Sequence, residues 1–430
     1  MITASARRDG YSAFGQKNPR ATFPSVALGW TFTQEKFMEP TQSWLDYGKV
    51  RLSWGQNGNR DIGIYDALSN LNSGFYPYVN QSGSIYVASQ LYVNRMANEN
   101  LKWERTASTN LGIDYSFLNN RISGSIDGYI STTNDLLVDR ALPDVTGFNN
   151  VAANLGKLRN KGLEFSVNFK AIDKDNFKWN TNANFSMNRR EIVALYGDME
   201  DVLDAEGNPT GEQREVDDPD NGWFIGQDPD RIWSYEGDGV WQMEEAAEAE
   251  KYGNRPGDFK YIDQNGDGVM TDADRTFQGY TTPRFRWMWR NEFTFHKDFT
   301  FSCMMYSNIG QYRNYGIATN SYTFPDRSSA YDIPRWTPAN PINDYARVES
   351  KNIGTHYINS SFIRLDNVAF SYNLPKSLLS KFKVQNMRLS LSVRNVAVFS
   401  PKWDFFDPES TSYWGGISPR TFNVGVNFTL

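Results

Sequence analysis

The sequence predicts an all-β protein, a transmembrane antiparallel β-barrel, and three observations support this prediction. Apolar and polar residues alternate in about twelve segments of roughly ten residues, the length that a tilted strand needs to cross a bilayer. Short turns and long polar loops join these segments alternately, as in outer-membrane barrels. Aromatic residues make up 15% of the 430 residues, far too many for a disordered chain. No run approaches the roughly 20 apolar residues that a membrane helix needs.

The last ten residues follow the strand pattern without exception. One face carries Phe422, Val424, Val426, Phe428 and Leu430, and the other carries Thr421, Asn423, Gly425, Asn427 and Thr429. Successive side chains of a strand point to opposite faces, so a period of two gives one apolar and one polar face. The same alternation predicts strands at 26–33, 110–117, 163–170, 179–188, 285–289, 299–303, 368–372 and 387–393.

The lengths of the connections separate a membrane barrel from a soluble all-β protein. Short turns are predicted at 118–121, 172–176 and 296–298, and Asn119 and Asn120 tolerate the positive φ of a type I′ turn. Long polar connections are predicted near 57–103, 132–160, 190–282, 309–360 and 397–419. If the C-terminal strand ends at the periplasm, every long loop is extracellular, including the 190–282 loop. The alternative is a large soluble sandwich or propeller, although no blade-length repeat is visible.

Charge and composition argue against several classes of function. The net charge of −6, without a basic stripe, argues against a nucleic-acid partner. Cys303 is the one cysteine, which excludes an internal disulfide framework, and two histidines leave little for metal or acid–base chemistry. No nucleophile elbow, phosphate loop or zinc signature occurs, so we expect no catalytic residues and no enzyme. The first ten residues lack the apolar region of a signal peptide; for an exported protein we therefore expect a missing N-terminus, processed away or cut from a longer chain.

One loop segment has the spacing of an EF-hand calcium loop. In 263–274 the oxygen ligands at positions 1, 3, 5, 7 and 12 would come from Asp263, Asn265, Asp267, the Val269 carbonyl and Asp274. Gly266 stands at position 6, where the loop turns sharply, and Asp274 replaces the usual glutamate with a shorter side chain. No pair of EF-hand helices is predicted around the segment. We therefore expect structural Ca²⁺ that holds a long loop, with a metal-free polar turn as the alternative.

Two groups of residues are candidates for contact with a solute. A polar ladder on the inward face of one predicted strand consists of Asn180, Asn182, Asn184 and Asn188; it lines the interior, or touches a plug or a solute. Aromatic residues cluster in the predicted loops at Tyr76, Tyr78, Tyr86, Tyr92, Trp223, Phe224, Trp233, Tyr235 and Trp241. They either stack on sugar rings or peptide side chains, or supply the loops with a core of their own. Neither group identifies the substrate-binding residues.

Several motifs, in order along the whole chain, resemble the SusC/RagA family of TonB-dependent transporters from Bacteroidetes. They are Arg8-Asp9-Gly10 with Phe14-Gly15, Phe23-Pro24-Ser25-Val26-Ala27-Leu28-Gly29-Trp30, Ser53-Trp54-Gly55-Gln56-Asn57-Gly58-Asn59, Leu101-Lys102-Trp103-Glu104-Arg105-Thr106, Arg159-Asn160-Lys161-Gly162-Leu163-Glu164, Arg335-Trp336-Thr337-Pro338, Phe362-Ile363-Arg364-Leu365 and Asp407-Pro408-Glu409. The resemblance implies a 22-stranded barrel of which residues 1–430 are the C-terminal part, holding about the last 12 strands. The signal peptide, the plug domain and the TonB-binding segment are then expected to be absent from the chain.

The resemblance also implies a function and partners. It implies import of a glycan, an oligosaccharide or a peptide nutrient through the outer membrane. A SusD-like surface lipoprotein would serve as the lid, and the TonB complex would act through the missing N-terminal region. The alternatives are a passive outer-membrane channel of twelve strands and a soluble carbohydrate-binding β-protein. The sequence does not decide between sugar and peptide.

Overall fold

The computed structural model describes residues 1–12, 17–60, 67–142, 144–148, 150–204, 207–314, 334–348, 350, 356–379, 384–403, 406–410 and 418–429. Phe14, Gly15 and Leu430 of the sequence patterns lie outside the described residues. The chain divides into two compact units. Unit 1 comprises Met1–Leu118, Ser125–Leu163 and Asn188–Pro229, and unit 2 comprises Asn119–Gly124, Glu164–Met187 and Asp230–Leu430. None of the described helices is long and apolar enough to span a membrane.

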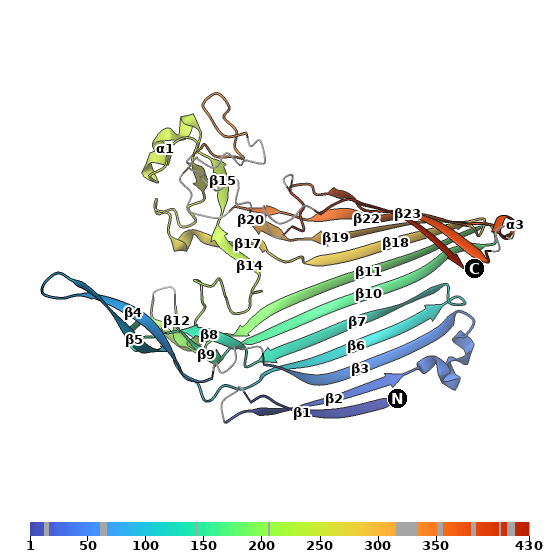
Figure 1. Ribbon diagram of the computed structural model, residues 1–430, viewed down its shortest axis with the longest axis horizontal. Helices are drawn as coiled ribbons and strands as arrows, with labels where there is room; N and C mark the ends of the chain where they lie inside the picture. The colour runs from blue at the N-terminus through green and yellow to red at the C-terminus, as the bar shows by residue number, and fades with distance from the viewer. Residues whose placement is uncertain are drawn as a thin grey trace. The chain divides into compact units, whose positions relative to one another are not determined.

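Twelve long strands form one sheet whose order follows the chain (Figure 1). They are β1 (Ile2–Gly10), β2 (Arg20–Trp30), β3 (Leu45–Asn59), β6 (Glu104–Phe117), β7 (Ile122–Asn134), β10 (Lys157–Lys174), β11 (Phe177–Ala194), β18 (Phe285–Phe295), β19 (Phe299–Ile309), β22 (Phe362–Asn373), β23 (Asn386–Phe399) and β24 (Thr421–Thr429). Every neighbouring pair whose register is described is antiparallel. The predicted all-β fold with about twelve antiparallel strands is therefore confirmed.

The two faces of the sheet differ as the alternation predicts. Directly paired residues of antiparallel strands share a face. In unit 1, Leu28, Leu52 and Leu111 pair across β2, β3 and β6, and all three side chains are exposed. In unit 2, Phe293, Phe301, Phe370 and Leu391 form a similar row across four strands. We call this side the apolar face and the opposite side the polar face.

From β2 onward the connections alternate in length along the sheet. The short turns at 118–121, 175–176 and 296–298 join β6 to β7, β10 to β11 and β18 to β19. Asn119 and Asn120 have φ of 58° and 56°, and His296 and Lys297 have φ of 49° and 66°, as turns of this kind require. The long connections 60–103, 135–156, 195–284, 310–361 and 400–420 all join strands at the other end. We call the two ends the short-turn end and the long-loop end.

One predicted strand is too long. The segment 26–33 was expected to be extended throughout, but β2 ends at Trp30 and a 3-10 helix, η1, covers Phe32–Gln34. The Phe32 ring lies over Gly48, where an added Cβ would come within 2.3 Å of its Cζ. Thr33 Oγ1 accepts a hydrogen bond from the Gly48 amide at 3.1 Å. These contacts with β3 turn the chain out of the strand, and alternation within one strand cannot reveal them.

The loops contain their own small elements. Two-stranded sheets pair β4 (Asn70–Val79) with β5 (Ile85–Arg95), β8 (Leu137–Ala141) with β9 (Asn150–Asn154), β12 (Met199–Leu203) with β13 (Pro209–Glu215), β14 (Arg231–Tyr235) with β17 (Arg275–Tyr280), β15 (Gly237–Val240) with β16 (Phe259–Tyr261), and β20 (Tyr312–Asn314) with β21 (Tyr357–Asn359). The helices are η2 (Lys36–Thr41), η3 (Asp144–Thr146), η4 (Met243–Glu245), α1 (Ala246–Lys251), η5 (Asp272–Asp274) and α3 (Lys376–Leu379).

Three of the long connections in unit 2 build a common core. We call the described residues of 231–280, 334–348, 356–359 and 400–410 the loop module. Its buried residues are Val240, Phe259, Tyr261, Trp336, Ala346 and Trp403. Trp336 Nε1 donates to Gln242 Oε1 at 2.9 Å, and the Asn343 side chain accepts from the Val240 amide at 2.8 Å. The module therefore depends on contacts between residues about a hundred positions apart.

Candidate functional site

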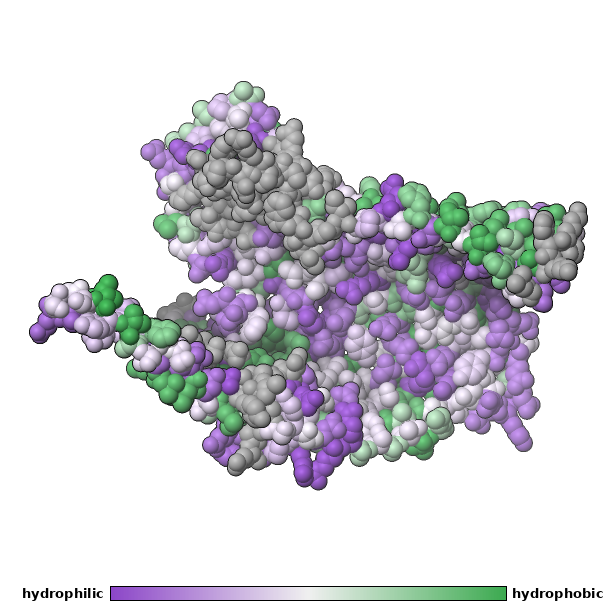
Figure 2. All heavy atoms as spheres, in the orientation of Figure 1, coloured by the Kyte–Doolittle hydropathy of each residue, from purple (hydrophilic) through white to green (hydrophobic). Residues whose placement is uncertain are grey.

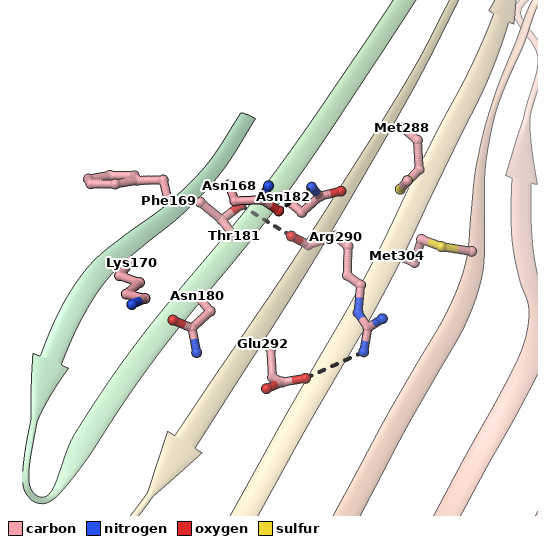
Figure 3. Close-up of a pocket in the computed structure, with 10 residues that line it drawn as sticks. All are labelled: Asn168, Phe169, Lys170, Asn180, Thr181, Asn182, Met288, Arg290, Glu292 and Met304. Carbon is pink, nitrogen blue, oxygen red and sulfur yellow. Dashed lines mark hydrogen bonds and ion pairs between the residues drawn. The ribbon is translucent and has the colours of Figure 1, made fainter. Parts of the chain in front are cut away.

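A pocket of about 540 Å³ opens on the polar face of unit 2 (Figure 3). It is lined by Asn168, Phe169, Lys170, Asn180, Thr181, Asn182, Met288, Arg290, Glu292 and Met304. The strands position these side chains by register, since Asn182 pairs with Arg290, and Arg290 pairs with Met304. Asn180 pairs with Glu292 one step nearer the short turns. The pocket is thus a consequence of polar positions in register on β10, β11, β18 and β19.

The pocket presents donors, acceptors and both signs of charge. Arg290 Nη2 lies 3.4 Å from Glu292 Oε2, a weak ion pair that leaves both groups able to bind a polar molecule (Figure 3). Asn182 Nδ2 donates to Asn168 Oδ1 at 2.7 Å, so these two amides hold each other in place. Met288 and Met304 add flexible apolar surface beside the charges. This arrangement can hold a polar solute by hydrogen bonds and by charge.

The structure brings only half of the predicted asparagine ladder to the pocket. Asn180 and Asn182 line it, whereas Asn184 and Asn188 lie further toward the long-loop end of β11. Asn188 Oδ1 accepts a hydrogen bond from Tyr129 at 3.3 Å. Sequence analysis missed Arg290 and Glu292. The sequence did contain a signal for them. Arg290 follows Trp289 and Glu292 precedes Phe293, so both alternate with the aromatic residues of this strand and fall on its polar face.

A charge cluster occupies the polar face of unit 1. Arg51 on β3 donates to both carboxylate oxygens of Asp114 on β6, each at 2.9 Å. Its Nη2 also lies 2.9 Å from Asp127 on β7. One guanidinium therefore ties three neighbouring strands together through two carboxylates, and such bidentate pairs are the strongest ion pairs that proteins form. The cluster fixes the register of these three strands, and the charge of Arg51 is balanced within the wall.

A buried arginine fixes a loop segment to the polar face of unit 2. Arg364 on β22 is 2% exposed and donates to Asp407 at 2.5 Å and to Glu409 at 2.8 Å. The Tyr306 hydroxyl donates to the same Glu409 carboxylate at 2.5 Å. Asp407 and Glu409 belong to the acid-proline-acid motif that the sequence analysis identified. The motif thus has a positioning role: it holds the end of the loop module against β19 and β22.

The predicted calcium segment forms a compact turn closed by its own backbone. Asp263 accepts from the Gly266 and Gly268 amides at 2.7 and 2.8 Å, and these bonds, that to Gly268 first, hold the pKa of its carboxyl below the usual value. Fully buried Asp274 accepts from the amides of Gln264 and Thr271. Asn265 and Asp267 accept from the amides two residues ahead, and the Val269 side chain is exposed. Within the described residues, no three His, Cys, Asp or Glu side chains are already arranged as a metal site.

The loop aromatics divide into two groups. Trp241 is buried, and Tyr235 packs against the core of the loop module. In contrast, Tyr76, Tyr78, Tyr86 and Tyr92 of the β4–β5 hairpin are all exposed. Trp233 packs against Phe277 across β14 and β17, with the ring centres 4.7 Å apart and the rings tilted by 56°. The loops of unit 2 therefore use these aromatics as a core, whereas the hairpin aromatics remain open to contact.

Comparison with known proteins places this architecture in a family. Residues 1–282 match the family described as "TonB dependent receptor-like, beta-barrel". The whole chain is 31% identical over 435 residues to TonB-dependent receptor P3 of Formosa agariphila, covering 42% of that protein. It is 30% identical over 451 residues to TonB-dependent receptor SusC of Bacteroides thetaiotaomicron, again over its whole length, and covers 41% of SusC. The chain thus spans less than half the length of the curated relatives it matches.

A solved structure supports the same fold. The RagAB peptide transporter superposes on 99% of this chain with a TM-score of 0.75 at 23% identity, and the match covers 45% of that chain. The relatives carry the names of receptors and transporters rather than of enzymes. The predicted SusC/RagA resemblance and the predicted outer-membrane location are therefore confirmed. The chain belongs to the TonB-dependent receptor-like β-barrel family and is an outer-membrane protein of SusC/RagA type.

Proposed function

We propose that this protein imports an oligosaccharide or peptide nutrient across the outer membrane, as the barrel part of a SusC-like, TonB-dependent transporter. The polar pocket is the observation that supports this proposal most. It places an arginine, a glutamate, a lysine and three asparagines on the face opposite the exposed apolar side chains. A polar solute passing this wall exchanges its water for hydrogen bonds that are numerous but individually weak. Weak contacts suit a transporter, because the solute must also leave.

The proposed partners are a SusD-like surface lipoprotein and the TonB complex, the latter acting through a region outside this chain. The loop module is consistent with the proposed lipoprotein partner. Its loops share one packed core, so they offer a lid a single ordered surface rather than a set of separate loops. RagAB is described as a peptide importer with "closed-closed" and "open-open" states. By analogy, we propose a lid that opens and closes on the long-loop end, which would then be extracellular.

The pocket chemistry is compatible with both proposed substrate classes. Arg290 and Glu292 can bind the carboxylate and the amine of a short peptide, each as a charge-assisted hydrogen bond. The asparagine amides at 168, 180 and 182 can bind sugar hydroxyls as donors and as acceptors. Arg290 Nη2 and Glu292 Oε2 lie 3.4 Å apart, so a zwitterionic peptide that binds both side chains would have to break this ion pair.

Uptake by intact cells tests the proposal. Cells with and without the gene are given fluorescently labelled oligosaccharides and labelled peptides, each with and without a protonophore. We expect uptake of one class to require both the gene and the proton gradient. Gene-dependent uptake that ignores the protonophore would instead indicate a passive channel. Equal uptake of every probe by both strains would overturn the proposal.

A pair of matched variants tests the role of the pocket. Arg290→Met removes the pocket charge, and Arg286→Met makes the same change on the same face of β18, outside the lining residues. We expect Arg290→Met to lower uptake about tenfold, which corresponds to loss of one charge-assisted hydrogen bond. Arg286→Met should leave uptake within about twofold. Equal effects of the two variants would remove the pocket from the transport path.

We also propose that the 263–274 segment binds structural Ca²⁺ through Asp263, Asn265, Asp267, the Val269 carbonyl and Asp274. The spacing supports it, and each carboxylate oxygen that accepts an amide retains a second lone pair for a cation. Metal content and protease resistance of the loop are measured in the wild type and in Asp267→Ala, with and without a chelator. We expect calcium in the wild type only, with faster loop cleavage after chelation. Identical metal content and cleavage in both proteins would exclude the site.

A further inference from the structure

The apolar face of unit 1 changes character at the long-loop end. On β1, β2, β6, β10 and β11 the outward positions there carry cationic side chains in place of apolar ones. We call this set the basic row: Arg8 on β1, Arg20 on β2, Arg105 on β6, Arg159 and Lys161 on β10, and Arg189 on β11. The whole chain is acidic, with a net charge of −6, so such a concentration of positive charge on one edge is unexpected.

Strand pairing places the basic row on the apolar face. In β1, Arg8 follows Ile2, Ala4 and Ala6 at a period of two, and Ile2 pairs with exposed Leu28. Arg20 is in line with Val26 and Leu28 along β2. In β6, Arg105 is in line with Leu111 and Ile113, which are also exposed. These arginines therefore share a face with the side chains that contact lipid.

The side chains of β10 are assigned by contacts on the opposite face. The Tyr129 ring lies directly over Gly162, where an added Cβ would come within 2.1 Å of its Cζ. Tyr129 is in line with Asp127, which binds Arg51 on the polar face. Because Gly162 faces inward, Lys161 and Leu163 face outward. Glu191 on β11 confirms this placement, since its Oε2 lies 3.6 Å from Arg159 and 3.4 Å from Lys161.

The basic row remains strongly positive after its internal contacts are counted. The Glu191 carboxylate is shared between Arg159 and Lys161, so it balances one of these two charges and not both. Arg8, Arg20, Arg105 and Lys161 are exposed. Guanidinium groups bind phosphate through two parallel, charge-assisted hydrogen bonds, so the exposed arginines of the row suit a phosphate ligand.

The row stands where the apolar band ends. On β11 the outward residues from Phe177 to Met187 are apolar or uncharged, and Arg189 is the next one. Ten steps of about 3.3 Å, tilted by about 40°, give a height of about 25 Å, which equals the apolar band of an outer-membrane barrel. On β10 Lys161 likewise adjoins Leu163. The basic row thus lies at the depth of the lipid headgroups.

Four strand ends of unit 2 lack this feature. The outward residues nearest the long loops on β18, β19, β22 and β23 are Phe285, Ile309, Ile363 and Phe399. All four are exposed and apolar. In unit 2 a cation stands in this position only beside β24, where exposed Arg420 precedes Phe422, among the residues that the structure describes on these five strands. The cations are therefore concentrated in unit 1 rather than spread evenly along the sheet edge.

We propose that the basic row binds the phosphate groups of anionic lipid headgroups in the outer leaflet of the outer membrane. The proposal joins two observations: a surface of positive charge, and its continuity with the lipid-contacting apolar face. It rests on the outer-membrane location and not on the transported substrate. If the row binds these phosphates, one part of the barrel wall holds a fixed set of lipid molecules around it.

The test uses the purified full-length protein in neutral detergent, with phosphorylated lipid A and its dephosphorylated form as probes. The variant Arg105→Gln/Arg159→Gln/Lys161→Gln removes three cations from the row. The matched control Lys174→Gln/Lys178→Gln/Lys297→Gln removes three cations at the short-turn end. Binding is measured by co-purification of the labelled lipid, and folding by protection of the sheet from protease.

We expect phosphorylated lipid A to bind the wild type at least tenfold better than the dephosphorylated form. Each removed cation should weaken binding about fivefold, so the triple variant should lose about 100-fold and the control almost nothing. The single variant Lys161→Gln, with a loss of about fivefold, serves if the triple variant does not fold. Equal binding by wild type and triple variant, or equal binding of both lipids, would overturn the proposal. So would unchanged lipid binding with loss of a co-purifying lipoprotein, because the row would then be a protein interface.

Discussion

The loop module and the β4–β5 hairpin are both built from loops rich in aromatic residues, but they use those residues in opposite ways. In the loop module Val240, Phe259, Trp336 and Trp403 are buried against one another. In the hairpin Phe75, Tyr76, Ile85 and Leu91 are all more than half exposed, and Figure 2 shows hydrophobic residues on its surface at the left of the view. A two-stranded hairpin has no second layer to cover its side chains. Burial therefore depends on whether a second loop folds onto the first.

The largest expected effect comes from the buried side of this comparison. Trp336 is 5% exposed, and its ring fills the space over Gly257. Trp336→Ala should destabilise the loop module by about 3 to 5 kcal/mol, as large-to-small changes in a core do. Limited proteolysis should then cut within 231–280 and 334–348, while the strands stay protected. Protection equal to that of the wild type would mean that the module core does not depend on this side chain.

A second test uses pH, because the module encloses an ionisable group. His356 packs on Phe259 at 4.1 Å between ring centres and lies beside Tyr261, and burial lowers its pKa to about 4. The unfolded chain binds a proton at its ordinary pKa near 6.5, and the folded module only near 4. The contribution of His356 to stability is therefore constant above about pH 6.5 and falls between pH 6.5 and 4, by at most about 3 kcal/mol.

The matched control for this test is His356→Phe, which keeps a ring against Phe259 but cannot take up a proton. Proteolysis of the module should accelerate for the wild type between pH 6.5 and 4.5, and the variant should accelerate less. If both proteins respond alike, other groups of the module cause the acid sensitivity.

The comparison also separates what the sequence could predict from what it could not. The strands were predictable, because the apolar face formed by Phe422, Val424, Val426 and Phe428 appears as every second residue of one short segment. The turn at 118–121 followed from Asn119 and Asn120, although Leu118 also adopts φ of 57° and was not anticipated. The loop module was not predictable, since Val240 meets Asn343 across 103 positions. Nothing in either local sequence indicates the other partner.

The candidate site, too, could be predicted from the sequence only in part. Asn180 and Asn182 were predicted on the polar face because their own strand alternates. The pocket, however, requires the register that sets Asn182 beside Arg290 and Met304, and register is a property of three strands together. The Arg364 cluster depends in the same way on a loop that returns more than 40 residues later. The motif Asp407-Pro408-Glu409 was recognisable, but its role as an anchor became visible only in the fold.

The smallest expected effect comes from the exposed side of the comparison. Phe75 is 77% exposed on β4, so Phe75→Ser should change the free energy of unfolding by less than about 0.5 kcal/mol. The measurement is the denaturant midpoint of the detergent-solubilised protein, with Trp336→Ala as the contrasting variant. Because the side chain buries almost nothing within this chain, removing it takes away little hydrophobic stabilisation. A loss above about 1 kcal/mol would mean that Phe75 is covered in the folded protein, and the contrast between the hairpin and the loop module would then no longer hold.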